Sequence, residues 1–398
     1  MYDRATEPGG QIMLKRALFL ALTALLAAGP ASAGPNDILI GLDQKVSYGP
    51  DGLVNGAPGK DEVLVMDVTI PAKPVIRARL PLMNSLLGPP ANLQITPDGK
   101  LGLVANSVLH TPDANGYKVS PDERLFVIDL TATPPKLADT VTVGKQPSGL
   151  AISHKGDLAL IANRNGKSVS VLSIASGKVA LVSDVPMEQE AAAVAITPDG
   201  KRAFVCLNMV NRIGVLSIDG QKVTYDKALD IPAAFNPYNI DIMPNGKFAV
   251  VSTTGAGKNN GDTMAVIDTS GPHPRTVYLM TPGNGPEGFT ISPDGKYVAA
   301  ALLLGSGAKQ NDWFKTKGGE LALMSLNPST GDLSVTARAP LGGLPEGLAF
   351  SPKSDYVYVG NYFDTDLQVF HIQGGKLKQA GANIKLGGQP ASMRALPH

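Results

Sequence analysis

Residues 286–302, PEGFTISPDGKYVAAAL, and residues 345–361, PEGLAFSPKSDYVYVGN, follow one pattern, and this pattern decides the fold. Each stretch starts with a proline, runs through an apolar segment to a Ser-Pro turn, and ends in a second apolar segment. Short apolar runs that are rich in β-branched and aromatic residues and bounded by turn residues are typical of β-strands. Each stretch therefore predicts a β-hairpin.

The hairpin pattern recurs along the chain in seven registers, which lie 44 to 59 residues apart. A third apolar run follows, and a Gly-containing turn then leads toward a fourth. Blades of β-propellers repeat at roughly 40–50 residues, which is longer than most helical-hairpin repeats. The residues that open each hairpin and its turn are Pro90 and Pro97, Pro147 and His154, Ala191 and Pro198, Pro237 and Pro244, Pro286 and Pro293, Pro345 and Pro352, and Pro390 and Pro397.

The two ends of the chain complete one another. The last register supplies only a first strand, whereas the residues after position 34 supply strands two to four at 37–41, 63–67 and 74–82. Joining these strands makes a seventh blade and removes the free sheet edges of an open array. The sequence thus predicts an all-β fold, a seven-bladed β-propeller of four-stranded antiparallel blades, closed by one C-terminal strand joined to three N-terminal strands.

The amino-acid composition agrees with this fold and argues against two classes of binding partner. The 44 Gly and 32 Pro residues supply turns, and 43% hydrophobic residues supply a large core. The 35 Lys and Arg residues nearly balance the 34 Asp and Glu residues, which gives a formal net charge of +1. Nucleic acid and anionic membrane surfaces attract proteins with a basic stripe, so we expect neither as a partner.

Residues 1–33 predict an export signal. Lys15 and Arg16 precede an apolar stretch that ends in the small residues 31–33, and this order is typical of a cleaved signal peptide. Met13 is an alternative start. No later segment holds 18 consecutive apolar residues, so we expect no membrane span, and no Cys follows the cleavage site to accept a lipid. The sequence predicts a single propeller domain over 34–398 in a periplasmic or secreted protein.

The repeat resembles a known family. Second strands such as 356–361, YVYVGN, the Ser/Thr-Pro-Asp-Gly-Lys turns and the Val-Ile-Asp third strands are similar to those of YVTN-repeat β-propellers over about residues 37–398. That family includes exported bacterial proteins and is related in fold to bacterial lactonases and to the heavy chain of quinoprotein amine dehydrogenases. The resemblance implies the fold strongly and the activity weakly, because it rests on a structural repeat.

Two carboxylates occupy equivalent places beside the repeated proline. Glu287 and Glu346 each follow the residue that opens a first strand, in adjacent blades five and six when blade one opens at Pro90. Such a pair at one channel mouth can bind a hard cation such as Ca²⁺ together with Asn239, or can divide acid and base roles. The run 345–350 also resembles gluconolactonase and regucalcin propellers, where an inner-strand Glu is a metal ligand. That family's Asp ligand and base have no clear match in this chain.

Long connections surround the same mouth and add further candidates. They follow the second strands of blades one, four and five, and a fourth spans about 43–61 in the N-terminal blade. Binding residues usually lie on variable loops that a rigid scaffold holds. An indole in such a loop either anchors the loop or offers a stacking surface. The candidate ligand-binding residues are Asn92, His110, Arg164, Asn239, Glu287, Trp313 and Glu346.

The sequence leaves more than one class of function open. Regular repeats without a Cys-x-x-Cys-His, G-x-S-x-G or P-loop signature favour a non-enzymatic scaffold, whose loop face binds a protein, a cell-envelope component or a small ligand. The alternative is a lactonase-like hydrolase of a small polar ester or lactone, with or without Ca²⁺, in which Glu287 and Glu346 are the candidate catalytic residues. A second alternative, by fold analogy, is an accessory subunit of a periplasmic redox system.

Overall fold

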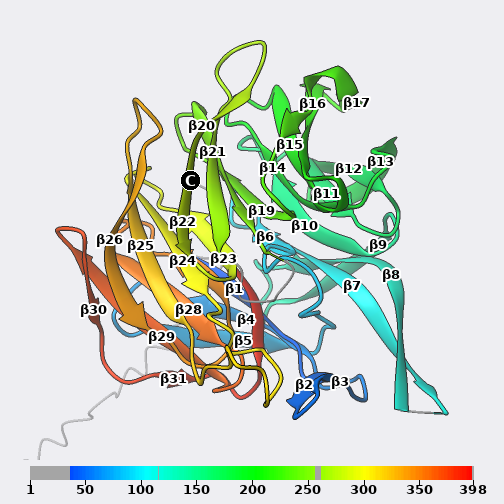
Figure 1. Ribbon diagram of the computed structural model, residues 1–398. Coiled ribbons are helices and arrows are strands. Elements are labelled where there is room, and N and C mark those ends of the chain that lie inside the picture. Colours follow the sequence, from blue (N-terminus) through cyan, green and yellow to red (C-terminus); the bar gives the residue numbers. More distant parts are fainter. Residues whose placement is uncertain (1–35, 115, 256–260, 397–398) are drawn as a thin grey trace, which may run out of the picture.

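The structure is a computed structural model that describes residues 36–114, 116–255 and 261–396. Seven antiparallel sheets of four or five strands follow one another around a ring (Figure 1). The only helical elements in the described residues are two single turns of 3-10 helix, Asn208–Val210 and Lys227–Leu229. The predicted seven-bladed β-propeller is therefore confirmed.

The blades are numbered as in the sequence, from the first strand at the channel outward. Blades one to three consist of β6 (Leu93–Ile95), β7 (Leu101–Asp113), β8 (Gly116–Asp129) and β9 (Lys136–Thr142); β10 (Pro147–Ile152), β11 (Leu158–Asn163), β12 (Ser168–Ala175) and β13 (Lys178–Pro186); and β14 (Ala191–Ile196), β15 (Arg202–Leu207), β16 (Arg212–Asp219) and β17 (Lys222–Tyr225), with β18 (Ile231–Pro232) paired to β16.

The remaining blades continue around the ring. Blades four to six consist of β19 (Pro237–Ile242), β20 (Phe248–Thr253), β21 (Asp262–Asp268) and β22 (Arg275–Gly283); β23 (Pro286–Ile291), β24 (Tyr297–Leu302), β25 (Glu320–Leu326) and β26 (Leu333–Pro340); and β27 (Pro345–Phe350), β28 (Tyr356–Asn361), β29 (Asp366–Gln373) and β30 (Lys376–Gln379), with β31 (Ile384–Lys385) paired to β29.

Blade seven joins the two ends of the described chain. Its strand order is β32 (Pro390–Ala395), β1 (Asp37–Leu42), β4 (Glu62–Asp67) and β5 (Val75–Leu80), and β1 pairs antiparallel with β32. This is the predicted closure by one C-terminal and three N-terminal strands. The predicted export signal, residues 1–33, lies outside the described residues. Across the described ranges, no helix is long and apolar enough to cross a membrane.

The core lies between the blades rather than at the centre of the ring. Side chains of β1 alternate between its two faces: Leu39 packs toward blade one, whereas Ile38 and Ile40 pack toward blade six. The other five junctions have the same arrangement, so that a buried apolar cluster fills each of the seven junctions between neighbouring blades. Strands buried on both faces read as continuous apolar runs, which explains the runs in the sequence.

The Ser/Thr-Pro-Asp-Gly-Lys turns join first and second strands through one recurring set of contacts. In blade three, the Thr197 hydroxyl donates to Asp199 over 2.6 Å, and that carboxylate accepts the Lys201 N–H over 3.0 Å. These bonds lower the pKa of Asp199, the bond from Thr197 most strongly. Gly200 follows with φ near +70°, a conformation that costs other residues a steric clash.

Replacing Gly200 by Ala is expected to destabilise the propeller by about 1 kcal/mol, because a Cβ at positive φ is strained. No atom lies within 4 Å of the position of that Cβ, so the loss reports the backbone conformation alone. Gly200→Asn is the matched control, since Asn tolerates this region better than Ala. Denaturant unfolding of the three proteins measures the difference, and equal stability of Ala and Asn variants would contradict the explanation.

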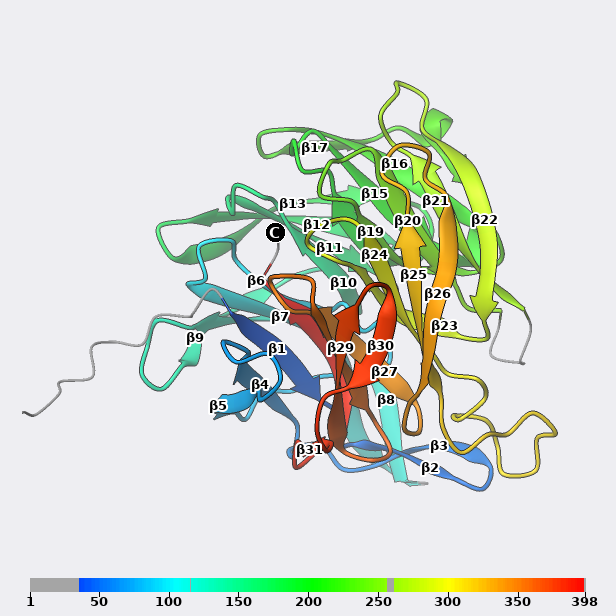
Figure 2. The ribbon, with the colours of Figure 1, turned by 90° about the vertical axis from the view of Figure 1, so that its left-hand side faces the viewer.

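Three extensions project from the same side of the ring (Figure 2). One is the hairpin of β2 (Val46–Gly49) and β3 (Gly52–Asn55), another is the distal part of the β7–β8 hairpin, and the third is loop 303–319. The connection predicted after the second strand of blade one is mostly strand, because β7 and β8 stay paired out to Asp113 and Gly116. These extensions surround one end of the channel.

Candidate functional site

The residue after the repeated proline points out of the blade hairpin in three adjacent blades. Pairing between first and second strands is interrupted just after Pro237, Pro286 and Pro345. Such a bulge leaves a residue without a cross-strand partner and re-aims its side chain. The residues concerned are Tyr238, Glu287 and Glu346 of blades four, five and six, and all three line the same cavity.

Glycines behind the two carboxyls let the inner strands approach one another. A Cβ at Gly288 would overlap the backbone carbonyl oxygen of Glu346, and a Cβ at Gly347 would overlap the backbone of Met393. The Gly288 Cβ position is also only 3.4 Å from Cγ of Pro90, across the channel in blade one. The inner strands therefore close the channel below the Glu residues and give the cavity a floor.

The cavity above this floor has a volume of about 370 Å³. Small-molecule sites usually occupy roughly 300–1,000 Å³, so the cavity suits a small ligand. A second hollow of about 120 Å³ lies at the other end of the inner strands, where the Asp241 carboxylate is occupied by Thr290, Ile291 and Arg394. The larger cavity is lined by Tyr48, Leu86, Leu87, Gly88, Arg164, Asn236, Tyr238, Thr254, Asp262, Asn284, Gly285, Glu287, Leu303, Gly305, Gly307, Ala308, Phe314, Leu344 and Glu346.

Glu287 is the carboxyl that titrates near neutral pH. Burial raises its pKa to about 7, against the opposing effects of a hydrogen bond from the Tyr238 hydroxyl and the charge of Arg164. A pKa near the working pH is what general acid–base catalysis requires. Glu287 is therefore suited to gain and lose a proton at neutral pH.

Glu346 holds its proton more tightly than Glu287. Only 2% of its surface is exposed, and burial together with the neighbouring Glu287 raises its pKa well above the usual range. Its Oε2 atom is buried without a hydrogen-bond partner. Unpaired buried polar groups are rare and costly in folded proteins, so this atom is available to a ligand. Two neighbouring carboxyls with separated pKa values can take opposite roles.

Glu346→Gln is expected to stabilise the protein at pH 8. A carboxyl whose pKa is higher in the folded than in the unfolded state costs stability once the pH exceeds the unfolded value, about 4.3 for Glu. Gln removes this cost and keeps the shape, so we expect a melting temperature about 1–3 °C higher at pH 8 and no gain at pH 4. Thermal unfolding at both values tests this, with the exposed Glu188→Gln as control.

Arg164, which follows β11 of blade two, and Asp262, at the start of β21 of blade four, also line the cavity. The Arg164 guanidinium carbon lies 5.9 Å from the centre of the Tyr238 ring, and its Nε is buried without a partner. Asp262 accepts the backbone N–H groups of Gly255 and Gly285, while burial raises its pKa. Among the described residues, the cavity lining therefore combines one cation, three carboxyls and the two phenols of Tyr48 and Tyr238.

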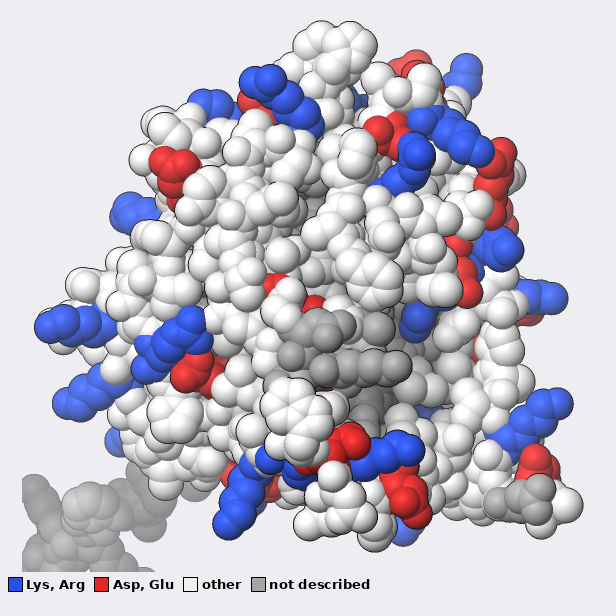
Figure 3. Space-filling view, viewed as in Figure 1, with Lys and Arg blue, Asp and Glu red and all other residues white. Residues whose placement is uncertain are grey.

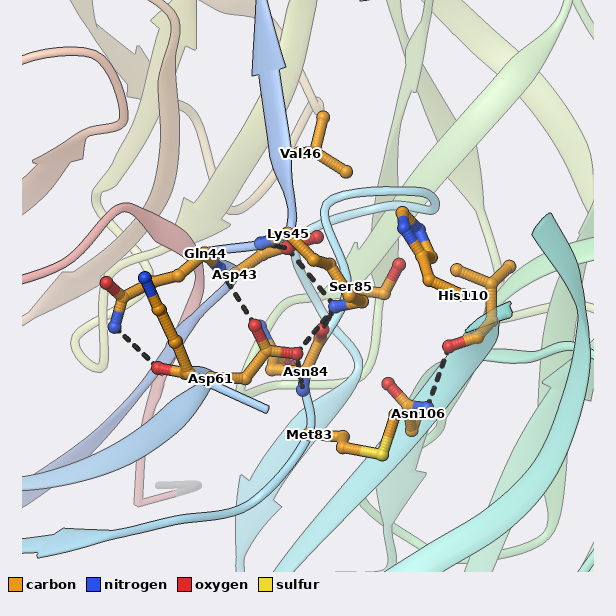
Figure 4. A network of polar contacts seen from close by, with 12 residues as sticks. Asp43, Gln44, Lys45, Val46, Asp61, Met83, Asn84, Ser85, Asn106 and His110 are labelled. Carbon is orange, nitrogen blue, oxygen red and sulfur yellow. Dashed lines mark hydrogen bonds and ion pairs between the residues drawn. The ribbon is translucent and has the colours of Figure 1, made fainter. Parts of the chain in front are cut away.

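An N-terminal insertion forms one wall of the cavity and is held by a buried lysine (Figure 4). The Lys45 ammonium lies 2.6 Å from Asp61 and 3.1 Å from Asp43 and also donates to the carbonyl of Asn84. All three charged side chains are essentially inaccessible to water. The network ties both ends of the insertion, residues 43–45 and residue 61, to the segment that leads into blade one.

Tyr48 is the residue of this insertion that lines the cavity. Its ring packs edge-on against Phe363 with the centroids 5.1 Å apart, and burial and the charges of Glu346 and Glu287 raise the pKa of its hydroxyl. The Tyr362 hydroxyl donates to the carbonyl of Val46 over 2.8 Å, so the insertion is also attached to blade six. The position of Tyr48 thus depends on contacts at both ends of the insertion.

The structure brings three of the predicted ligand residues into the cavity, namely Arg164, Glu287 and Glu346. Asn92 and Asn239 are buried outside its lining. The Asn92 amide donates to Asn84 and to the carbonyl of Ala105, and the Asn239 side chain accepts the N–H of Ile240. Asn239 follows the bulged residue Tyr238, whereas the pairing of β6 with β7 beside Asn92 shows no such register shift.

His110 and Trp313 also lie outside the cavity lining. His110 is on the extended part of β7, where its Nδ1 lies 3.0 Å from the carbonyl oxygen of Gly56 in the insertion. Trp313 is 87% exposed and packs against Phe314, which itself lines the cavity. Phe314 therefore anchors the loop, and a ligand role for Trp313 or His110 stays a prediction.

The proposed calcium ligands do not form a complete donor set. The Oδ1 atom of Asn239 accepts the backbone N–H of Ile240. Of the three predicted ligands, only Glu287 and Glu346 therefore remain available to a cation. Within the described ranges, no group of three or more His, Cys, Asp or Glu side chains could hold a metal ion. Ca²⁺ prefers six to eight oxygen ligands, so we route no chemical step through a metal.

The sequence analysis did not single out Tyr238, Tyr48, Asp262 or the Lys45 network. A signal for Tyr238 was present, since it occupies the position of Glu287 and Glu346 after the repeated proline. Tyr48, Asp262 and Lys45 follow no repeat, and only the folding of the insertion and the blade-four loop brings them to the site.

The face that Figure 3 shows has charged side chains of both signs. On the face that Figure 3 shows, Lys and Arg side chains lie mainly toward the periphery and are interspersed with Asp and Glu. This distribution agrees with the small formal net charge of +1. The cavity, rather than the surface charge, is therefore the strongest functional feature.

Comparison with known proteins agrees with the fold and narrows the function. Residues 115–234 match the family model described as lactonase, seven-bladed beta-propeller. No curated protein matches the sequence. This family match covers blades one to three only in part, and solved structures extend the comparison to the other blades.

Three solved structures illustrate the similarity. A putative 6-phosphogluconolactonase from Bacteroides uniformis is 18% identical, with a TM-score of 0.66, and the match covers 90% of this chain and 99% of that one. The periplasmic gluconolactonase of Pseudomonas aeruginosa is 19% identical, with a TM-score of 0.63 and coverage of 90% and 98%. Hydrazine synthase of Kuenenia stuttgartiensis is 21% identical, with a TM-score of 0.56 and coverage of 73% and 78%. At these identities the similarity shows the fold alone.

The comparisons correct the preferred function from the sequence. A non-enzymatic binding scaffold was the leading prediction, and it is wrong as the leading interpretation. The lactonase family model matches residues 115–234, and proteins named as lactonases recur among the structural neighbours. The partial family match therefore favours the lactonase-like alternative over the scaffold.

Proposed function

We propose that the protein is a hydrolase of small polar lactones and that the reaction takes place in the cavity at the channel mouth. The observation that carries this proposal is the pair of neighbouring carboxyls, Glu287 and Glu346, whose pKa values are raised to different extents. The partial match to the lactonase family supports it. The finer resemblance to YVTN-repeat propellers and export to the periplasm or outside the cell belong to the same proposal.

In the proposed reaction Glu287 is the general base and Glu346 the general acid. Ionised Glu287 takes a proton from a water molecule as its oxygen bonds to the lactone carbonyl carbon. Protonated Glu346 donates its proton to the ring oxygen as the bond from that oxygen to the carbonyl carbon breaks. The product is the open-chain hydroxy acid, and proton exchange with solvent restores both carboxyls. General acid and base catalysis each contribute roughly 10²- to 10⁴-fold to a rate.

Arg164 supplies positive charge beside the same reacting atoms. The lactone carbonyl oxygen gains negative charge as water adds, and donors aimed at this charge lower the barrier. The guanidinium beside Tyr238 has a buried Nε without a partner, so it can donate to this oxygen. Tyr238 in turn donates to Glu287 and holds the base in place.

A panel of five- and six-membered aldonolactones tests the proposal. Purified protein should release acid faster than the spontaneous reaction, as followed with a pH indicator, with and without added Ca²⁺. Glu287→Gln and Glu346→Gln should lose this activity, whereas the exposed Glu188→Gln, which removes only a surface ion pair with Lys227, should keep it. Hydrolysis at the spontaneous rate across the panel, at every pH from 5 to 9, would refute the proposal.

A further inference from the structure

We infer that the cavity selects an uncharged lactone and discriminates against one that carries a phosphate or another fixed anion. This inference rests on the proposed function, since it names the substrate class of the same site. It follows from the charges and hydrogen-bonding groups that the described residues place around the cavity.

The described lining of the cavity offers no second cation for an anionic substituent. Arg164 is the only Lys or Arg among the described residues of its lining, which also holds the carboxyls of Asp262, Glu287 and Glu346. The charge of Arg164 acts on Glu287, so that it is already balanced by a neighbouring carboxylate. A phosphate would bring about two further negative charges into a site that carboxyls already line.

The usual phosphate-binding devices are also missing from the described part of the lining. Phosphates are held by forked Arg contacts, by Lys, or by the N-terminus of a helix. The only helical elements in the described ranges of the chain are single turns in blade three, and neither contributes a lining residue. The Asn236 amide, a further donor in the lining, is occupied by Thr254.

The remaining groups suit the hydroxyls of an uncharged sugar-like ring. Glu346 Oε2 and Arg164 Nε, which are buried without partners, serve the ring oxygen and the carbonyl oxygen of the lactone in the proposed reaction. The Tyr48 and Tyr238 rings add flat apolar surface, and Leu86, Leu303 and Leu344 line the rest. Aromatic rings with a polar tip contact both the C–H face and the hydroxyls of such a ring.

The test compares D-glucono-1,5-lactone with its 6-phosphate ester at one pH and ionic strength. We expect kcat/KM to be at least ~10-fold higher for the uncharged lactone, since like charges a few ångströms apart repel strongly in a partly buried site. Equal or faster turnover of the phosphate ester would overturn this inference and leave the proposed lactonase activity standing. Spontaneous rates with both compounds, from pH 5 to pH 9, would overturn the lactonase proposal and this inference with it.

A substitution that adds a positive charge to the cavity lining provides a second test of the inference. Ala308→Lys adds a cation to the lining and should shift the ratio of the two kcat/KM values toward the phosphate ester by about tenfold. Leu181→Lys adds the same charge on the outer strand β13, where Leu181 is exposed, and should leave the ratio unchanged. A ratio that moves equally in both variants, or in neither, would contradict selection by charge within the cavity.

Discussion

Replacing Glu287 by Gln is expected to lower kcat for lactone hydrolysis by about 10²- to 10⁴-fold, the usual contribution of a general base. Gln keeps the size and can still accept the hydrogen bond from Tyr238, but it cannot take a proton from water. Steady-state kinetics should show the loss in kcat, with KM changed much less, because substrate contacts to Arg164 and Tyr48 remain.

The pH dependence of the wild-type protein provides the matching measurement. Glu287 must be ionised to act as a base, and its pKa is about 7, so kcat/KM should rise as the pH increases through 7 and be lost below it. Arg164→Met removes the charge that opposes the effect of burial on Glu287, so this rise should move to higher pH. A profile that is flat from pH 5 to 8, or a Glu287→Gln variant with unchanged kcat, would exclude Glu287 as the base.

Lys45→Met is expected to destabilise the protein by about 3–5 kcal/mol, the usual loss when one partner of a buried ion pair is removed. Asp43 and Asp61 would then remain buried without their cation, since both are inaccessible to water. Denaturant unfolding measures the loss. Lys227→Met is the matched control, because its ion pair with Glu188 is exposed and such pairs contribute about 0–1 kcal/mol.

The loss at Lys45 should depend on pH with a definite sign. Burial already raises the pKa of Asp61 against the opposing charge of Lys45, so removing Lys45 should raise that pKa further, and a carboxyl shifted in this way favours the folded state as the pH falls. The variant should therefore be closer to the wild type at pH 5 than at pH 8. Because Tyr48 lies three residues beyond Lys45, we also expect KM for the lactone to rise. Unchanged KM in a folded variant would show that the network does not position Tyr48.

The propeller could be predicted from the sequence because its determinants are local and repeated. The hairpin at 345–361 contains its own strands and its own turn. Each further copy of the repeat supports the same prediction independently. The closing blade was also predictable, since the last register lacks the strands that the N-terminus has in excess. Repeat architecture thus made up for weak signals in any single strand.

The site was only partly predictable, and the reason is physical. Glu287 and Glu346 could be predicted as site residues because both directly follow the repeated proline, at equivalent positions of two repeats. Asn92 and Asn239 lie one residue further along the same repeat, but both side chains hydrogen-bond to backbone groups and lie outside the cavity lining. The Lys45 network and Tyr48 depend on how an insertion without repeats packs over blade six. Such packing is a property of the assembled ring.

The pairing of β1 with β32 also has a consequence for biosynthesis. One edge of β1 pairs with β4, but the other edge of residues 38–41 pairs only with residues 392–395, so a nascent chain carries an unpaired β1 edge until β32 has left the ribosome. Exposed strand edges promote aggregation, and joining distant segments slows folding. If the chain is exported as the sequence predicts, late closure would keep it open for translocation. Loss of residues 390–396 should then yield insoluble protein rather than a six-bladed ring.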